Sequence, residues 1–362
     1  MLTRVCAAAF VLFAAPFVIA PAYTFPEPRP FSGPAFWNPY AHLSGSWRRA
    51  NLHAHGRAWI GLTNGHQSDA AVIDVYRRHG YDIAGISDYQ RIAAYHGADT
   101  LPLYEHGYNI AKAHQLAIGA WRVEWLDFPL WQTLSQKQFL INRVARTAAL
   151  LAINHPNTAY ADADLERLTG YQLMEVLNGP FVYESSWDAA LSSGHVVWAI
   201  GDDDNHDVTY APRFGVACSM IDAPSTRAPD VLTSLRDGRV FAMSLRSQTP
   251  EAWLSSVDVH DTRLTVSIAG APATFQFIGP HGIVRQMSTD TVSATYTIGR
   301  DDAYVRTVIR TPQTVMYLNP IVRYDGVRLP MPASAIDLPI TWARRTLLLL
   351  AGIVGLWWLA TR

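Results

Sequence analysis

The chain has 362 residues, a formal net charge of −1 and 16% charged residues. This length allows one large domain or two medium ones with a sizeable core. A net charge so close to zero excludes an overall field that attracts nucleic acid, so we expect no nucleic-acid partner. The sequence predicts no particular protein partner.

Residues 1–22 have the pattern of a secretory signal peptide. Arg4 supplies the positive charge, residues 5–20 are apolar, and residues 20–22 (Ala-Pro-Ala) form a small-x-small cleavage site. The alternative is an uncleaved membrane anchor. Cysteine usage agrees with export, because Cys6 lies in this segment and Cys218 alone cannot form an internal disulfide.

Residues 23–46 are rich in proline and aromatic residues, which predicts an extended arm. Residues 47–248 alternate strand and helix patterns, which is typical of a parallel sheet. Strands are expected over 47–55, 81–87, 101–104, 114–120, 150–154, 171–177, 196–200 and 214–220. Helices are expected over 69–79, 136–149, 186–191 and 229–235. Alternating segments joined by Gly, Pro and Asp turns then predict a small β-sandwich-like domain over 249–332.

A second apolar stretch lies near the end of the chain. Residues 346–360 carry no charge, and we expect a transmembrane helix over 343–361 that anchors an exported body. Arg344 and Arg345 would then lie on the outer side, against the positive-inside rule. The alternative is a helix that packs on the body or lies in the membrane interface.

Polar side chains follow several of the predicted strands. His53 and His55 are two residues apart at a strand end, so both point to the same face. Asp204 and His206 repeat this spacing. The carboxyl ends of strands in a parallel barrel converge on one face, and imidazole with carboxylate suits zinc, iron or manganese. The candidate metal ligands are His53, His55, Glu105, His114, His155, Asp204 and His206.

This set resembles the PHP (polymerase and histidinol phosphatase) superfamily over roughly residues 47–245. Residues 51–55 resemble its His-x-His motif, 86–89 its Asp-His motif, 104–105 its central acid and 204–206 its closing Asp-x-His. Residues 114–119 and 154–156 match two further stretches. The resemblance implies a distorted (β/α)7 barrel and a metal-dependent phosphoesterase.

The resemblance also implies individual roles. A first metal would be held by His53, His55 and Asp204. Glu105 would bridge to a second metal held by His114 and His155. A hydroxide between the two cations would attack the phosphorus in line.

Tyr89 departs from the family pattern, which usually has histidine at this position. Whether there is a third metal site is therefore an open question; His206 would be its clear ligand, and His66 or Asp88 would complete it. In the alternative interpretation, Tyr89 hydrogen-bonds the substrate. The candidate catalytic residues are Asp88, Tyr89 and Arg213. Arg57, Arg91 and Arg213 each have two interpretations. Each either binds a phosphate in a bidentate manner or forms a salt bridge at the surface.

Four further polar residues have simpler interpretations. His106 is expected to be an ordinary polar residue, and Glu175 to pair with a base or to support a ligand from behind. The run of Asp202 and Asp203 beside Asp204 concentrates negative charge, which a nearby cation would stabilise.

We therefore predict an exported, membrane-anchored hydrolase with two or three divalent ions (Zn, Mn or Fe). It would cleave a small phosphate mono- or diester outside the cytoplasm, in the periplasm or its equivalent. One alternative is a binuclear hydrolase of other esters or amides. Another is a binding module that recognises a surface ligand, with its metals closed off by protein groups rather than open to water.

Overall fold

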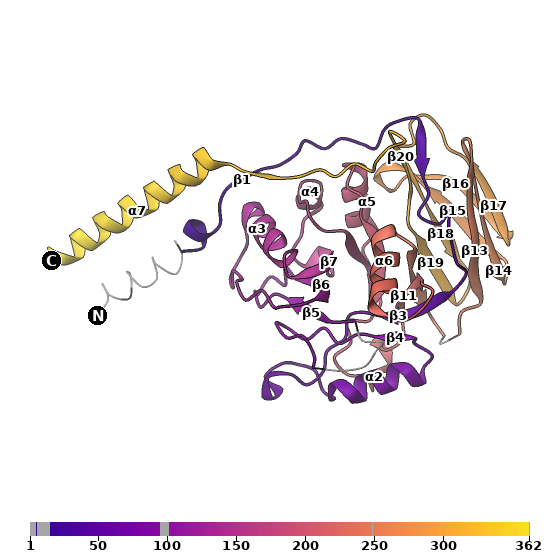
Figure 1. Cartoon of the computed structure of the whole chain (residues 1–362), viewed down its shortest axis with the longest axis horizontal. Helices are drawn as coiled ribbons and strands as arrows, with labels where there is room; N and C mark the ends of the chain where they lie inside the picture. Colours follow the sequence, from indigo (N-terminus) through magenta and orange to yellow (C-terminus); the bar gives the residue numbers. More distant parts are fainter. Residues whose placement is uncertain (1–4, 6–14, 95–100, 248, 362) are drawn as a thin grey trace.

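Strands form most of the body, and α-helices pack against them (Figure 1). The structure is a computed structural model that describes residue 5 and residues 15–94, 101–247 and 249–361. Its class is mixed α/β, and one long apolar helix projects from the body. The first part of the predicted signal segment, residues 1–4 and 6–14, lies outside the described residues.

One sheet carries five strands in the order β10-β8-β7-β6-β5, with β9 on the edge of β8. The pairs β7–β8 and β8–β10 are parallel, whereas β5–β6 and β6–β7 are antiparallel. The bounds are β5 Leu103–His106, β6 Gln115–Ala120, β7 Ala148–Ile153, β8 Leu173–Asn178, β9 Phe181–Val182 and β10 Trp198–Asp202.

A second sheet follows the order β16-β15-β18-β19-β12-β11-β3-β4, with β20 paired to β18 and β2 paired to β20. The strands are β2 Ala35–Trp37, β3 Trp47–Asn51, β4 Ile83–Ala84, β11 Ala217–Asp222, β12 Val240–Leu245, β15 Ala273–Ile278, β16 Val284–Thr291, β18 Tyr304–Arg310, β19 Thr314–Leu318 and β20 Ile321–Tyr324. A third sheet holds β13 Ala252–His260, β14 Arg263–Gly270 and β17 Ser293–Thr297. The second sheet contains strands from both sides of residue 248 in the sequence. The domain boundary expected at this residue stays a prediction.

The helices are α2 Asp69–Arg78, α3 Leu134–Val144, α4 Asp162–Leu165, α5 Glu184–Ser192, α6 Ala228–Asp237 and α7 Leu338–Ala360. In the part of the chain that the structure describes, they are too few for the expected (β/α)7 barrel, which the structure does not show. The physical reason is local: β5 and β6 pair antiparallel and need no crossover helix, and β7 also pairs antiparallel with β6, although α3 lies between them in the chain. Isolated bridges, Tyr89 to Glu105 and Ala54 to Asn205, link the edges of the first two sheets.

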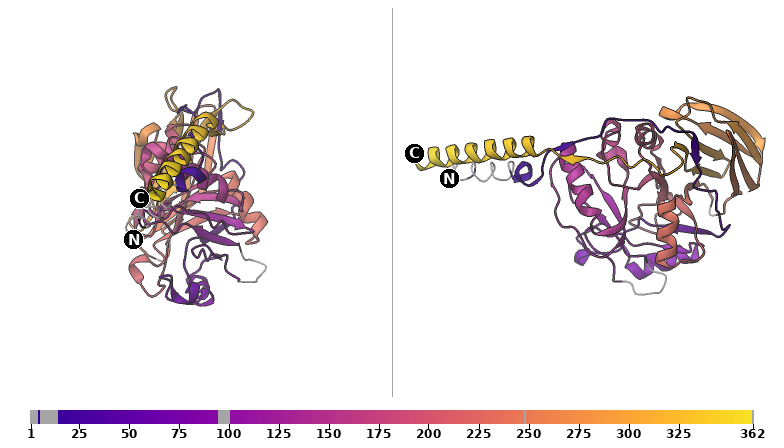
Figure 2. Two further views of the ribbon diagram at one scale, coloured as in Figure 1. Left: turned by 90° about the vertical axis from the view of Figure 1, so that its left-hand side faces the viewer. Right: turned by 45° about the horizontal axis from the view of Figure 1, so that its top comes forward.

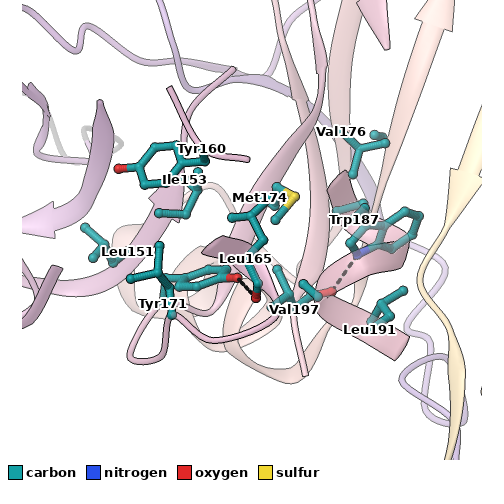
Figure 3. Packing of buried hydrophobic residues seen from close by; sticks show 14 of the residues in the cluster. Leu151, Ile153, Tyr160, Leu165, Tyr171, Met174, Val176, Trp187, Leu191 and Val197 are labelled. Carbon is teal, nitrogen blue, oxygen red and sulfur yellow. Dashed lines mark hydrogen bonds between the residues drawn. The ribbon is translucent and has the colours of Figure 1, made fainter. Parts of the chain in front are cut away.

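One apolar core cluster packs the first sheet against its helices and reaches the second sheet (Figure 3). Leu151 and Ile153 of β7 face Met174 of β8, and all three are fully buried. Trp187 of α5 is also fully buried, and its Nε1–H donates a 2.8 Å hydrogen bond to Val197 O. Burial of these residues holds α5 against the sheet and so fixes the strand ends that carry polar residues.

A buried ion-pair cluster joins α5 to β18. Arg306 Nη2 lies 2.6 Å from Asp188 Oδ2, and its Nη1 lies 2.7 Å from Glu184 Oε2. The Tyr304 hydroxyl donates to Asp188 Oδ1 at 2.8 Å. Buried charges of this kind hold segments in register but leave an uncompensated charge when one partner is removed.

We expect Arg306→Met to lower the free energy of unfolding by about 3–5 kcal/mol, because Asp188 would stay buried without its guanidinium partner. Denaturant titration of the solubilised protein measures this loss. Arg78→Met is the control, because the Arg78–Asp74 pair is exposed, with side chains 66% and 65% accessible. Equal losses in the two variants would contradict a structural role for the buried cluster.

Candidate metal centre

All seven predicted ligand side chains lie in three groups of closely spaced donor atoms. Within each group the donor atoms are all within 4.8 Å of one another. Glu105 is shared by two of the groups, and His55 is also shared by two, so the groups are contiguous. The groups are His53–His55–Glu105, Glu105–His114–His155 and His55–Asp204–His206.

Strand ends bring these residues together. His53 and His55 follow β3, His155 follows β7, and Asp204 follows β10. Glu105 lies within β5, while His114 comes directly before β6. Because β6 runs antiparallel to β7, the first residue of β6 pairs with the last residue of β7, at the same edge of the sheet.

Two ligand-bearing turns adopt left-handed backbone conformations. Asp204 has φ +47° and His155 has φ +27°, a region that non-glycine residues rarely adopt. Hydrogen bonds to the two neighbours of Asp204 hold its turn in place: Asp203 N donates to Asn51 Oδ1 at 2.8 Å, and His55 N donates to Asn205 O at 2.8 Å. Strain maintained by its surroundings is common at functional sites.

The first pair of histidines faces two carboxylates. His53 Nε2 and His55 Nε2 lie 3.1 Å apart, and Glu105 Oε2 is 3.3 Å from each. Asp204 Oδ1 is 3.3 Å from His53 Nε2 and 3.4 Å from His55 Nε2. Among the described residues, Glu105 Oε2 is buried without a hydrogen-bond partner. Donor atoms that converge in this way fit a cation better than they fit one another.

The other oxygen of Glu105 faces a second pair of histidines. Glu105 Oε1 lies 3.0 Å from His114 Nδ1 and 3.3 Å from His155 Nε2. Asn154 Nδ2 donates to the same oxygen at 2.9 Å. The two carboxylate oxygens of Glu105 therefore serve different histidine pairs, as a bridging carboxylate does.

Electrostatics keep Glu105 ionised. Burial alone would raise its pKa, but His53 and His114 hold the pKa of Glu105 well below its usual range. Burial disfavours a charged His53, yet Glu105, Glu175 and Asp204 raise the pKa of its imidazole well above normal. Burial and the neighbouring His55 lower the pKa of His206 to about 4, so its lone pair is free at neutral pH.

This donor set fits divalent metal ions. Each group combines imidazole nitrogen with carboxylate oxygen, the ligands that zinc, manganese and iron accept in proteins. The centre is mostly enclosed, but the side chains of Asp204 and His206 are 13% and 21% accessible. The centre is therefore open to solvent on the side of these two residues.

Glu175 supports the ligands from behind. Its Oε1 lies 2.5 Å from His53 Nδ1, and its Oε2 accepts hydrogen bonds from His155 N at 2.8 Å and Asn178 Nδ2 at 3.0 Å. Because Glu175 contacts Nδ1 of His53, the Nε2 atom of His53 is directed at the His53–His55–Glu105 group. Glu175 thus fits the supporting role considered from sequence, whereas Asn154 was not singled out except as the neighbour of His155.

Asp88 and Tyr89 take different positions. Asp88 accepts a 2.8 Å hydrogen bond from Gly56 N and pairs with Arg91, and it belongs to none of the three described groups. Tyr89 stacks on His55 with 4.5 Å between ring centroids, and its hydroxyl lies 3.4 Å from His206 Nε2. Burial, reinforced by Glu105, raises the pKa of Tyr89, so it remains a neutral phenol.

Arg213 is the arginine that reaches the centre. Its Nη2 lies 4.0 Å from Asp204 Oδ2 and donates to Asn178 Oδ1 at 2.9 Å. Its guanidinium also lies over the Phe181 ring, 5.6 Å from the centroid. Arg91 instead binds Asp69 and Asp88, and Arg57 is exposed.

Three sequence interpretations change or gain detail. Asp203 is stabilised by backbone donors: Gly215 N, Val216 N and Ala217 N all donate to it. His66 is exposed and pairs with Asp207 at 3.0 Å, outside the three groups. His106 hydrogen-bonds Gln115 and Leu126 O, an ordinary structural role.

Comparisons with known proteins add little. No protein-family model matches the chain, and no curated protein matches it. A solved structure from Bacteroides vulgatus ATCC 8482, described as a two-domain protein containing a predicted PHP-like metal-dependent phosphoesterase, is similar at 12% identity with a TM-score of 0.43. The match covers 86% of this chain and 100% of that chain. So distant a likeness supports no assignment, and the site is interpreted from its own side chains.

We expect Glu175→Gln to weaken metal affinity by about 10- to 100-fold, because an amide holds the His53 imidazole less firmly than a carboxylate. Competition with a chromogenic chelator measures the affinity for Mn²⁺ and Zn²⁺. Glu27→Gln, at an exposed position of the arm, is the matched control. Identical affinities for wild type and Glu175→Gln would show that Glu175 does not orient a ligand.

Proposed function

We propose that this chain is a metal-dependent phosphoesterase that cleaves a phosphate mono- or diester. The observation that carries the proposal is the position of Glu105, whose two oxygens face two different histidine pairs. One cation would be held by His53, His55 and Asp204 and a second by His114 and His155, with Glu105 shared. The order of these motifs along the chain, which resembles that of the PHP superfamily, supports the same reading.

Zn, Mn or Fe ions bound there would lower the pKa of water toward neutrality and withdraw charge from the phosphoryl oxygens. The donor atoms of His55, Asp204 and His206 would hold a third ion. The surrounding residues supply shape and orientation: Glu175 holds His53, and Asp88 holds Gly56 N beside His55.

Arg213 and Tyr89 are suited to bind the substrate. Both lie near Asp204 and His206, on the accessible side of the centre, and the Arg213 side chain is 31% accessible. A guanidinium binds the non-bridging oxygens of a phosphate in a bidentate manner. The phenol of Tyr89 can donate a hydrogen bond to another oxygen of the same group. A small phosphorylated substrate is therefore preferred over a carboxylic ester or amide.

The accessibility of Asp204 and His206 also favours catalysis over a binding module. A structural metal site is closed by protein ligands, whereas a catalytic one keeps a position for water. The proposal accordingly places water and substrate on the side of these two residues.

We further propose that the body works outside the cytoplasm, tethered to a membrane. Within the described residues, α7 is long and apolar enough to cross a bilayer, and only 6% of its segment Leu338–Gly355 is buried inside the protein. Export itself is part of the proposal.

We expect Arg213→Gln to lower kcat/KM for p-nitrophenyl phosphate or bis-p-nitrophenyl phosphate by about 10- to 100-fold, since it removes a charged hydrogen-bond donor. Steady-state kinetics on the Mn²⁺-loaded and Zn²⁺-loaded enzyme measure this effect, with metal content unchanged. Arg57→Gln is the control. If the loaded wild type cleaved p-nitrophenyl acetate but neither phosphate ester, the phosphoesterase proposal would be wrong.

A further inference from the structure

Residues 20–22, the last of the segment that has the pattern of a cleavable signal, are built into the fold. Ala20 and Ala22 are only 5% and 3% exposed. Ala20 packs with Phe128 and Leu140 in a small apolar cluster. Cleavage after Ala22 would remove both alanines and expose the apolar side chains that Ala20 covers.

Backbone hydrogen bonds tie the same residues to the start of α7. Ala22 N donates to Thr341 Oγ1 at 2.9 Å, a buried contact, and Asp337 N donates to Ala22 O at 2.9 Å. Immediately beyond, β1 (Tyr23–Thr24) pairs antiparallel with β21 (Ala335–Ile336). Removing Ala22 would therefore take the acceptor from Asp337 N and the backbone donor from Thr341 Oγ1, which also donates to Asp337 O.

Arg345 makes a third link. Residues 15–19 are helical, and the last carbonyl groups of a helix lack partners within it. Arg345 Nε donates to one of them, Val18 O, at 3.0 Å. A guanidinium at a helix C-terminus also interacts favourably with the helix dipole. This contact gives Arg345 a structural role at the start of α7.

Most described side chains in the rest of α7 are exposed. Leu347, Leu349 and Ile353 are 66%, 63% and 62% exposed. In Figures 1 and 2, α7 projects away from the body, with the helical residues that precede β1 beside it. At 1.5 Å per residue, its 23 residues measure about 34 Å, close to the thickness of a bilayer core.

We propose that the N-terminal apolar segment is retained and that its described helical residues, 15–19, lie beside the start of α7 in a shared membrane anchor, joined to the body through β1 and β21. The partner of the apolar surface of α7 is then the lipid bilayer. Both ends of the chain leave the body at the same place, so the body sits on one side of the membrane. This anchor does not depend on the metal chemistry.

The N-terminus of the full chain tests retention. The protein, with a C-terminal tag, is expressed in a bacterial host, purified from membranes and analysed by intact mass and N-terminal sequencing. We expect residues 1–22 to be present, apart from removal of Met1. A secreted reporter with a cleavable signal, expressed in the same cells, confirms that processing is active. An N-terminus at Tyr23 would overturn the proposal.

Limited proteolysis of the detergent-solubilised protein tests the pairing. Arg345→Gln should speed cleavage near residues 20–24 by about five- to tenfold, because it removes the donor to Val18 O. Arg344→Gln is the matched control, since Arg344 is exposed while Arg345 is half-buried. If Arg345→Gln is cleaved at the wild-type rate, the pairing with α7 is wrong.

Discussion

A single buried carboxylate, that of Glu105, determines how the polar centre is organised. It is fully buried, and it stays ionised only because histidines lie on both sides of it. Burying such a charge without partners would cost several kcal/mol. Its partners come from three separate segments, residues 53–55, 114 and 154–155, so the edges of two sheets must meet at this point. The bridges from Tyr89 to Glu105 and from Ala54 to Asn205 hold that junction together.

Much of this centre could be predicted from sequence because the ligands follow local rules. His53 and His55 point the same way because residues two apart on extended chain do so, and their Nε2 atoms lie 3.1 Å apart. Pairing direction could not be predicted, since a strand has the same apolar pattern in parallel and antiparallel sheets. The antiparallel β6 therefore replaced part of the expected barrel, while it still brought His114 to the shared edge.

The role of each remaining acid could not be predicted, because it depends on distant partners. Glu175 and His53 are 122 residues apart, and Asp203 accepts from backbone groups 12 to 14 residues further along the chain. The same holds for the N-terminal segment. A signal peptide and a retained helix have a similar composition, so the contacts of Ala22 with Asp337 and Thr341 and of Val18 with Arg345 could not be predicted from sequence.

Anomalous diffraction from crystals of the manganese-loaded protein tests the central claim most directly. The account predicts a peak on each side of the Glu105 carboxylate, the first within bonding distance of His53 and His55 and the second of His114 and His155. A single peak bound by one histidine pair, or metal that does not contact Glu105, would contradict it.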